Sequence, residues 1–210
     1  MAEGLRERNK REKLERAKKA ARELFARHGF EATTIRQIAE HAGIGLGTLY
    51  SYVQTKHELL DLVFLDDWGR VEDESYASLP EDAELVEALL HVFGRMMDHY
   101  ARDPEMSRLY VRETLFPGAG DMGPRLERGV RVLQRVGGLV ERAQQRGEVD
   151  LRIEPLSAAT NLFGLYLVHL SAWLSGLRGQ EDTRAALRTS LELQLRGLRP
   201  APSLGRKSRT

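Results

Sequence analysis

Residues 33–56 constrain the fold more than any other stretch, because two short segments with helical apolar spacing follow each other across a single glycine. Thr34 and Gln37 have the spacing of a capping box, which predicts that a helix begins there. Gly43 stands where a sharp turn needs left-handed backbone angles, and a second helix is predicted from about Gly45. The stretch therefore predicts two short helices joined by a tight turn.

The segment before this stretch completes a three-helix unit. From about Lys10, apolar residues recur at steps of three and four, and Gly29 marks the end of this predicted helix. The inner faces of the next two helices are predicted to consist of Ile35, Ile38, Ala39, Ala42, Leu49 and Val53. Three helices with a glycine turn between the last two are typical of a helix-turn-helix.

The remainder of the chain also has helical periodicity. No segment has the period of a strand, so the predicted fold class is all-α with about nine helices. A long helix is predicted from Lys56, followed by helices over residues 81–102, 105–115, 125–146, 155–177 and 181–198. Residues 1–10 are predicted to form a disordered basic arm, and residues 199–210 a disordered basic tail.

The segment 155–177 is apolar on almost all sides. Its length would suffice to span a membrane, but Asn161 and His169 interrupt it and its flanks do not follow a positive-inside pattern, so no membrane span is predicted. A helix that is apolar all round is more often buried on both sides. We expect one side to pack on its own domain and the other on a second copy of the chain.

Charge is distributed unevenly along the 210 residues, although the net charge is only +1. Residues 1–60 hold 12 Lys and Arg against 8 Asp and Glu, whereas residues 61–198 hold 16 against 23. A basic front end on an acidic body is typical of a DNA-contacting module joined to a body that does not bind DNA. Charge alone does not separate this interpretation from a chance distribution in an Arg-rich helical protein.

The sequence lacks the residue patterns of an enzyme or a metal site. There is no cysteine, which excludes disulfides and thiolate ligands and is consistent with a cytoplasmic location. The six histidines are dispersed, and no zinc-protease, phosphate-loop or serine-elbow motif is present. The charged first residues do not predict a signal peptide. We therefore expect no catalysis, no metal and no cofactor.

Two helix N-termini are expected near each other, at Thr34 and near Gly45, and free backbone N–H groups at such ends favour phosphate. The third helix has no Arg, Asn or Gln, the side chains that make the best bidentate contacts with base edges. Leu46, Thr48 and Tyr50 are therefore expected to read thymine methyl groups and groove shape. The full predicted DNA-binding set is Thr33, Thr34, Arg36, Leu46, Gly47, Thr48, Tyr50, Ser51, Tyr52 and Lys56. A half-buried aromatic that braces the helix is an equally good interpretation of Tyr52.

The pattern G-F-x-x-T-T-I-x-x-I-A-x-x-A-G-I-x-x-G-T-L-Y-x-Y-x-x-x-K, at residues 29–56, resembles the DNA-binding signature of TetR/AcrR-type bacterial transcriptional regulators. The resemblance includes the first helix, whereas the rest of the chain matches only in the number and length of its helices. Gly45 stands where the family usually has Ser or Thr, and Val53 and His57 replace the commoner Phe and Glu. These departures bear on the operator sequence and not on the fold.

The resemblance implies a repressor that binds a palindromic double-stranded DNA operator as a homodimer and is released by a small-molecule effector. It implies a helix-turn-helix DNA-binding domain over residues 11–55 and a helical effector-binding and dimerisation domain over residues 56–198, with pairing through the last two helices. Two recognition helices held about 34–36 Å apart would read successive major grooves. The alternatives are a DNA-binding dimer without an effector, whose body is a dimerisation or partner-docking frame, and an all-α enzyme with an incidental helix-turn-helix.

The sequence offers candidates for the effector site and the dimer interface. The effector candidates are Trp68, Met96, Tyr100, Tyr110, Glu113, Phe116, Asn161, Phe163 and Tyr166, although Met and aromatic residues at helical spacing usually pack in a core. The interface candidates are Leu156, Phe163, Leu167, Leu170, Leu174, Leu187 and Leu191. Asn161 is expected to need a partner if it is buried, whereas His169 is expected to be structural.

Overall fold

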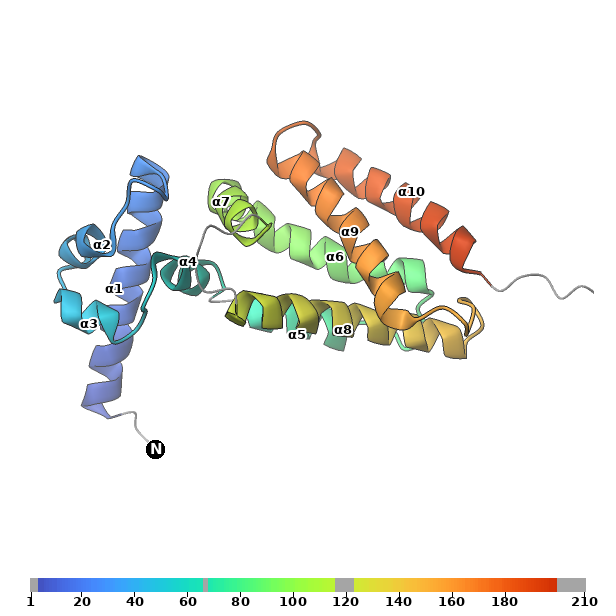
Figure 1. The fold of residues 1–210 in the computed structure, drawn as a ribbon, viewed down its shortest axis with the longest axis horizontal. Helices are drawn as coiled ribbons and strands as arrows, with labels where there is room; N and C mark the ends of the chain where they lie inside the picture. The colour runs from blue at the N-terminus through green and yellow to red at the C-terminus, as the bar shows by residue number, and fades with distance from the viewer. Residues whose placement is uncertain (1–3, 66–67, 116–122, 200–210) are drawn as a thin grey trace, which may run out of the picture. The chain divides into compact units, whose positions relative to one another are not determined.

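The computed structural model describes residues 4–65, 68–115 and 123–199, and within these ranges it contains ten α-helices and no strand (Figure 1). The all-α prediction is therefore confirmed, with one helix more than expected. The helices are α1 (Leu5–His28), α2 (Ile35–Ala42), α3 (Leu46–Tyr50), α4 (Lys56–Phe64), α5 (Trp68–Ala77), α6 (Leu85–Ala101), α7 (Pro104–Leu115), α8 (Gly123–Gln145), α9 (Pro155–Leu174) and α10 (Gln180–Leu198). None of these described helices is both long enough and apolar enough to cross a bilayer. Apart from its first residue, the predicted tail over residues 199–210 lies outside the described residues.

Helix α1 begins at Leu5, so the prediction of a disordered arm over residues 1–10 is wrong for its described part. Charges of opposite sign one turn apart favour a helix here, and Arg8 and Glu12 form an ion pair of 3.7 Å. Gly29 ends α1 as predicted, with a φ of 79°. The basic front end of the chain is therefore an extension of the first helix.

The long helix predicted from Lys56 is two helices, because α4 ends at Phe64 and α5 begins at Trp68. Helix α4 starts at a side-chain cap, since the hydroxyl oxygen of Thr55 accepts a hydrogen bond of 3.1 Å from the backbone N–H of Glu58. The start of α4 is thus fixed directly behind the helix-turn-helix.

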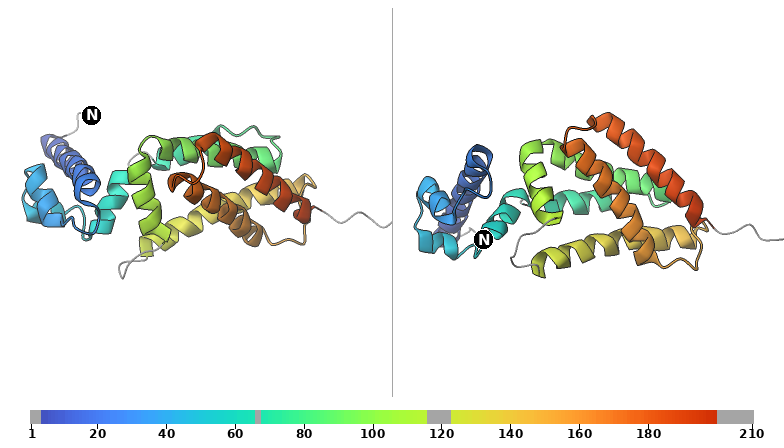
Figure 2. Two further views of the ribbon diagram at one scale, coloured as in Figure 1. Left: turned by 90° about the horizontal axis from the view of Figure 1, so that it is seen from above. Right: turned by 45° about the horizontal axis from the view of Figure 1, so that its top comes forward.

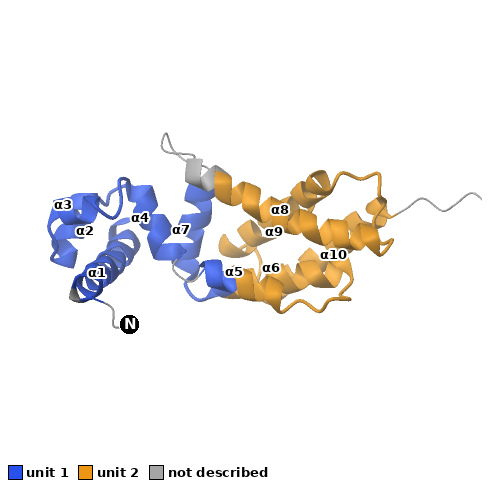
Figure 3. Ribbon diagram, turned by 90° about the horizontal axis from the view of Figure 1, so that it is seen from below, with its two compact units in different colours: residues 1–71, 99–120 blue, residues 72–98, 121–210 orange. Residues whose placement is uncertain are grey.

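The first of two compact units consists of Met1–Val71 and His99–Gly120 (Figure 3). In its described part, α1 packs against α2, α4 and α7, and α4 also packs against α7. The rings of Phe25 and Phe30 lie 5.2 Å apart between their centroids, and Ile38 is fully buried. Burial of an aliphatic or aromatic side chain of this size contributes roughly 1.5–3 kcal/mol. An apolar core therefore holds the helix-turn-helix on α1.

The second unit consists of Glu72–Asp98 and Asp121–Thr210. Helix α9 packs against both α8 and α10, as two further views show (Figure 2). Phe93 of α6 and Tyr166 of α9 stack with their centroids 4.5 Å apart, and Leu162 is fully buried. The apolar helix predicted over residues 155–177 is therefore the central element of this unit.

The two compact units do not meet at residue 55, where the sequence predicts the boundary between the functional domains. Helix α4 packs on α1 and α7 within the first unit, so the helix that follows the helix-turn-helix is not part of the second unit. The division into a DNA-binding domain and an effector-binding domain at residue 55 stays a prediction.

Candidate nucleic-acid interface

Helix α2 begins at the predicted capping box. The backbone N–H of Gln37 donates to the Thr34 hydroxyl oxygen at 3.2 Å, and the backbone N–H of Thr34 donates to Oε1 of Gln37 at 2.8 Å. These two backbone N–H groups, which have no partner within the helix, are thereby hydrogen-bonded. The cap is important because an isolated helix of eight residues is not stable by propensity alone. The capping box is confirmed, and the Thr34 side chain remains exposed.

The turn between α2 and α3 is held in two ways. Gly43 has a φ of 62° and a ψ of 40°, the left-handed conformation that was predicted for it. Nη2 of Arg16 on α1 donates to the carbonyl oxygen of Gly43 at 2.7 Å and also to that of Ala42. A Cβ atom on Gly43 would lie 2.7 Å from the same nitrogen. Sequence reasoning missed Arg16, because its partners are distant in the chain and no local pattern links them.

Helix α3 presents one side to solvent. Leu49 is fully buried, whereas Tyr50 is 43% exposed. Side chains beyond the helix bind its last carbonyl groups, since the Ser51 hydroxyl donates to the carbonyl oxygen of Thr48 at 2.7 Å and Nε2 of Gln54 donates to that of Tyr50 at 2.7 Å. The exposed tyrosine therefore lies on a short element that is fixed at its end.

The N-terminus of α3 is open to an approaching ligand. Its cap residue, Gly45, has extended backbone angles and offers no side-chain hydrogen bond. Gly47 is exposed, and a Cβ atom placed there would meet no atom within 4 Å. Free N–H groups and the helix dipole favour an anion at such an end.

Two of the predicted phosphate contacts are bonded to the protein itself. Thr33 is buried, and its hydroxyl donates to the carbonyl oxygen of Gly29 at 2.7 Å. Nζ of Lys56 donates to the carbonyl oxygens of Phe30 and Glu31 at 2.6 and 3.2 Å, and it lies 4.3 Å from the centroid of the Phe30 ring. The role of Thr33 is therefore corrected to a structural one, and Lys56 joins α4 to the segment between α1 and α2.

The rest of the predicted DNA-binding set lies on α2, α3 and the turn after α3. Five of its members are exposed: Thr34, Arg36, Gly47, Tyr50 and Ser51. Leu46, Thr48 and Tyr52 are half-buried. Half-burial suits a bracing role for Tyr52. The DNA contacts of all eight residues stay predictions.

The effector candidates in the first unit belong to a packed aromatic cluster. The ring of Phe64 stacks on Tyr110 with centroids 3.9 Å apart, and on Tyr100 at 5.4 Å, while Trp68 lies 6.1 Å away. Such pairs stabilise a core beyond the area that they bury. Phe116, another candidate, lies outside the described residues.

The candidate Glu113 is a buried acid whose carboxylate contacts an arginine and a histidine. Its carboxylate lies 2.9 Å from Nη2 of Arg112 and 3.3 Å from Nε2 of His57, which comes from α4. Only 9% of its side chain is exposed. A buried carboxylate needs such partners, so this residue connects α7 with α4 inside the first unit.

The effector candidates in the second unit are not equally buried. Met96 and Tyr166 are each 1% exposed, and Phe163 is half-buried with its ring centroid 5.7 Å from that of Tyr166. Asn161 is exposed, so it does not need a hydrogen-bond partner inside the protein. His169 is bonded to Ser190 at 2.9 Å, which fits the structural role expected for it.

Four of the predicted interface residues belong to the core of the second unit. Leu170, Leu174, Leu187 and Leu191 are at most 3% exposed, which leaves no surface for a partner to cover. They are corrected to core positions. Of the remaining candidates, Leu156 is 46% exposed, and Phe163 and Leu167 are half-buried. The prediction missed two exposed apolar side chains on α9 and α10, Val168 and Leu193.

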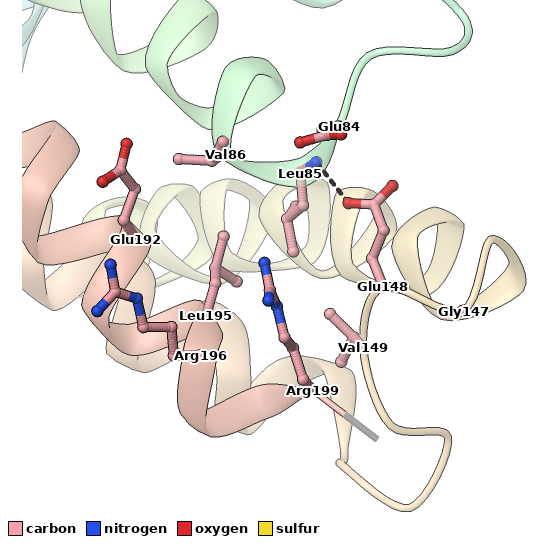
Figure 4. Close-up of a pocket in the computed structure, with 10 residues that line it drawn as sticks. All are labelled: Glu84, Leu85, Val86, Gly147, Glu148, Val149, Glu192, Leu195, Arg196 and Arg199. Carbon is pink, nitrogen blue, oxygen red and sulfur yellow. Dashed lines mark hydrogen bonds between the residues drawn. The ribbon is translucent and has the colours of Figure 1, made fainter. Parts of the chain in front are cut away.

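A groove of about 540 Å³ in the second unit contains none of the predicted effector residues (Figure 4). It is lined by Glu84, Leu85, Val86, Gly147, Glu148, Val149, Glu192, Leu195, Arg196 and Arg199. The backbone N–H of Leu85 donates to Oε2 of Glu148 at 2.7 Å, which joins two of the lining residues. With three carboxylates and two guanidinium groups, this lining does not select for an anion.

The three-helix core, the left-handed glycine turn and the exposed side of α3 place the chain among helix-turn-helix DNA-binding proteins. Residues 19–63 match the family model of bacterial regulatory proteins of the tetR family. Together with the relatives described next, this match supports the TetR-type bacterial transcriptional regulator that the resemblance predicted.

Relatives with known roles match most of the chain. It is 25% identical over 187 residues to the HTH-type transcriptional repressor KstR of Rhodococcus jostii (strain RHA1), covering 88% of this chain and 84% of that protein. It is 24% identical over 183 residues to the fatty acid metabolism regulator protein of Bacillus subtilis (strain 168), covering 85% and 92%. The crystal structure of Thermus thermophilus FadR, a TetR-family transcriptional repressor in complex with lauroyl-CoA, matches with a TM-score of 0.68 and 25% identity over 91% of this chain and 99% of that chain.

Proposed function

We propose that the chain represses transcription by binding a palindromic operator as a homodimer, and that an acyl-CoA thioester bound in its body releases it from DNA. The observation that carries the DNA-binding part is the exposed side of α3. Tyr50 and Ser51 face solvent there, while Leu49, Gly43 and Arg16 fix the helix from behind. A recognition helix needs this combination of an open outer side and a rigid inner side.

The homodimer is supported by exposed apolar side chains on the last two helices. Leu156, Val168 and Leu193 are 46%, 67% and 68% exposed. Burial of each would contribute up to roughly 1.5–3 kcal/mol. In a two-fold dimer each of these side chains is present in both copies, so both copies of it would be buried. Because α9 and α10 pack against each other, the same helix pair of a second copy would cover both.

The acyl-CoA class of effector is supported by a relative and by the composition of the core. Thermus thermophilus FadR was solved with lauroyl-CoA, and this chain shares 25% identity with it. In this chain Phe93, Met96 and Tyr166 are buried in the second unit. An acyl chain is apolar and needs such an interior, and methionine side chains adapt easily to a new neighbour.

The experiment measures operator binding and melting temperature with and without lauroyl-CoA. The DNA is a fragment that the protein itself selects from a random library, and coenzyme A and laurate are the controls. We expect lauroyl-CoA to release the DNA and to stabilise the fold, by about 2.7 kcal/mol at a ligand concentration of 100 Kd. Neither control should do both, because each carries only one half of the ligand.

The second candidate function is a DNA-binding dimer without an effector. The close stacking of Phe64 and Tyr110, with centroids 3.9 Å apart, favours it because the stacking gives the effector candidate Tyr110 a packing role in the core. In that case acyl-CoA thioesters of every chain length, and a wider library of metabolites, would leave both the melting temperature and the operator affinity unchanged.

A further inference from the structure

The N-terminal turns of α1 form one wall of a groove whose other wall is the turn directly after α3. The groove has a volume of about 540 Å³ and lies within the first unit. It is lined by Arg6, Glu7, Asn9, Lys10, Lys13, Ser51 and Tyr52. These turns belong to the segment that the sequence predicted to be disordered, so their position beside α3 is a finding of the structure.

Three cations lie along one face of α1 in this groove. Arg6, Lys10 and Lys13 are spaced by four and three residues, the spacing at which side chains share a helix face. All three are exposed, and Glu7 is the one acid among the lining residues. At 1.5 Å per residue the three positions span roughly 10 Å, about three steps of a nucleic-acid strand at 3.4 Å each.

Arg36 on α2 is exposed and belongs to the predicted DNA-binding set, whereas other basic residues near the turn are bonded within the protein. Arg16 binds the carbonyl groups of the turn, and the ammonium group of Lys56 binds two backbone carbonyl groups. Arg8 lies outside the groove and forms an ion pair with Glu12. Helix α3 itself contains no basic residue. Cations that neutralise phosphates supply a large share of the affinity of a protein for DNA, and the groove contains three cations.

We propose that Arg6, Lys10 and Lys13 bind phosphates of the DNA that flanks the half-site read by α3. The groove adjoins Ser51, which is exposed, and Tyr52, so its cations continue the predicted DNA-binding surface onto α1. The inference rests on the DNA-binding function proposed above and adds to it a second, sequence-independent contact. These side chains position the dimer on DNA and contribute affinity without reading bases.

The test is the salt dependence of operator binding by the full-length protein. The variant replaces Arg6, Lys10 and Lys13 by Ala, which is the best helix former and should leave the helix intact. Each lost phosphate contact reduces the slope of log K against log salt by about 0.9, so six contacts in a dimer reduce it by about 5. The control variant replaces Arg11, Lys19 and Arg27 by Ala, which changes the net charge equally at positions that do not line the groove.

We expect the groove variant to lose most of its affinity at low salt, to have a shallower slope and to select the same operator sequence. A slope that equals that of the control variant overturns the proposal. A parent protein that binds no discrete DNA sequence would instead overturn the DNA-binding function itself. If the triple variant does not fold, Lys10→Gln measured in the same way should reduce the slope by about 1.8 in a dimer, and an unchanged slope there contradicts the proposal equally.

Discussion

Replacing Lys56 by Met tests whether its ammonium group joins two parts of the protein in the absence of DNA. Methionine keeps most of the apolar stem and removes the charge. Nζ of Lys56 lies 2.6 Å from the carbonyl oxygen of Phe30, 3.2 Å from that of Glu31 and 4.3 Å from the Phe30 ring centroid. A hydrogen bond to a charged group contributes about 1.5–3 kcal/mol, and an exposed cation–π contact about 0.5–1 kcal/mol.

Two features reduce the expected loss. The carbonyl oxygen of Phe30 also accepts a hydrogen bond of 3.3 Å from the backbone N–H of Thr33, so the variant does not leave it unpaired. Lys56 is half-buried, and water can replace part of what its ammonium group provides. We therefore expect Lys56→Met to lower the free energy of unfolding of the first unit by about 2 kcal/mol.

Urea unfolding of the full chain, followed by tryptophan fluorescence, measures this loss. Trp68 belongs to the first unit and Trp173 to the second, so a Trp173→Phe background restricts the signal to the first unit. At about 1–3 kcal/mol per molar urea, the midpoint should fall by about 1 M. Lys19→Met, at an exposed position on α1, is the control and should leave the midpoint in place.

An unchanged midpoint for Lys56→Met would show that the ammonium group contributes no stability in the absence of DNA. If operator binding were lost at an unchanged midpoint, Lys56 would return to the role of a phosphate contact that the sequence predicted for it.

Four further predictions concern single residues. Thr34→Ala should lower the free energy of unfolding by about 1 kcal/mol because it removes the cap of α2, and Thr34→Ser, measured by the same urea titration, should restore most of it. Tyr50→Ala should weaken operator binding in gel shifts and leave the dimer intact in light scattering; a parent-like gel shift would show that α3 is assigned to the wrong surface. Val168→Asp should yield folded monomers, because the side chain is 67% exposed, and a dimer of unchanged stability would exclude this face from the interface. Hydrogen bonds from the side chain of Ser157 and from backbone N–H groups hold the pKa of Glu154 below its usual value. The stabilisation by this cap is therefore full above the usual pKa and is lost as the pH falls through the lowered one, so the difference in melting temperature between the parent and Glu154→Gln should disappear in acid.

Local rules were enough to predict the helix-turn-helix. The capping box at Thr34 and the left-handed turn at Gly43 depend on residues within three or four positions of each other, and both are present as predicted. The contacts that hold this unit in place could not be predicted in the same way. Arg16 binds a carbonyl group 26 residues away, and Lys56 reaches Phe30 over the same separation. No periodic pattern encodes such a pair, because it arises only when the helices have packed.

Helix α9 shows a different limit of sequence reasoning. Its apolar residues surround the helix, so periodicity did not separate the side that faces its own unit from the side that faces solvent. The sequence therefore predicts Leu170 and Leu174 at the interface, although the structure buries both, and it does not single out Val168, which is exposed. The prediction of a disordered arm over residues 1–10 is wrong in its described part for a different reason. The composition of these residues resembles that of a disordered segment, but Arg8 and Glu12 at helical spacing stabilise a helix.

Footprinting of the bound protein across its own genome tests whether α3 recognises a palindromic operator. We expect a small number of discrete sites, each a palindrome whose half-sites lie about one helical turn of DNA apart, as two symmetric copies of α3 require. We also expect Tyr50→Ala to remove these footprints. Diffuse binding without palindromic sites, or the same footprints for the Tyr50 variant, would contradict the assignment of residues 33–56 as the DNA reader.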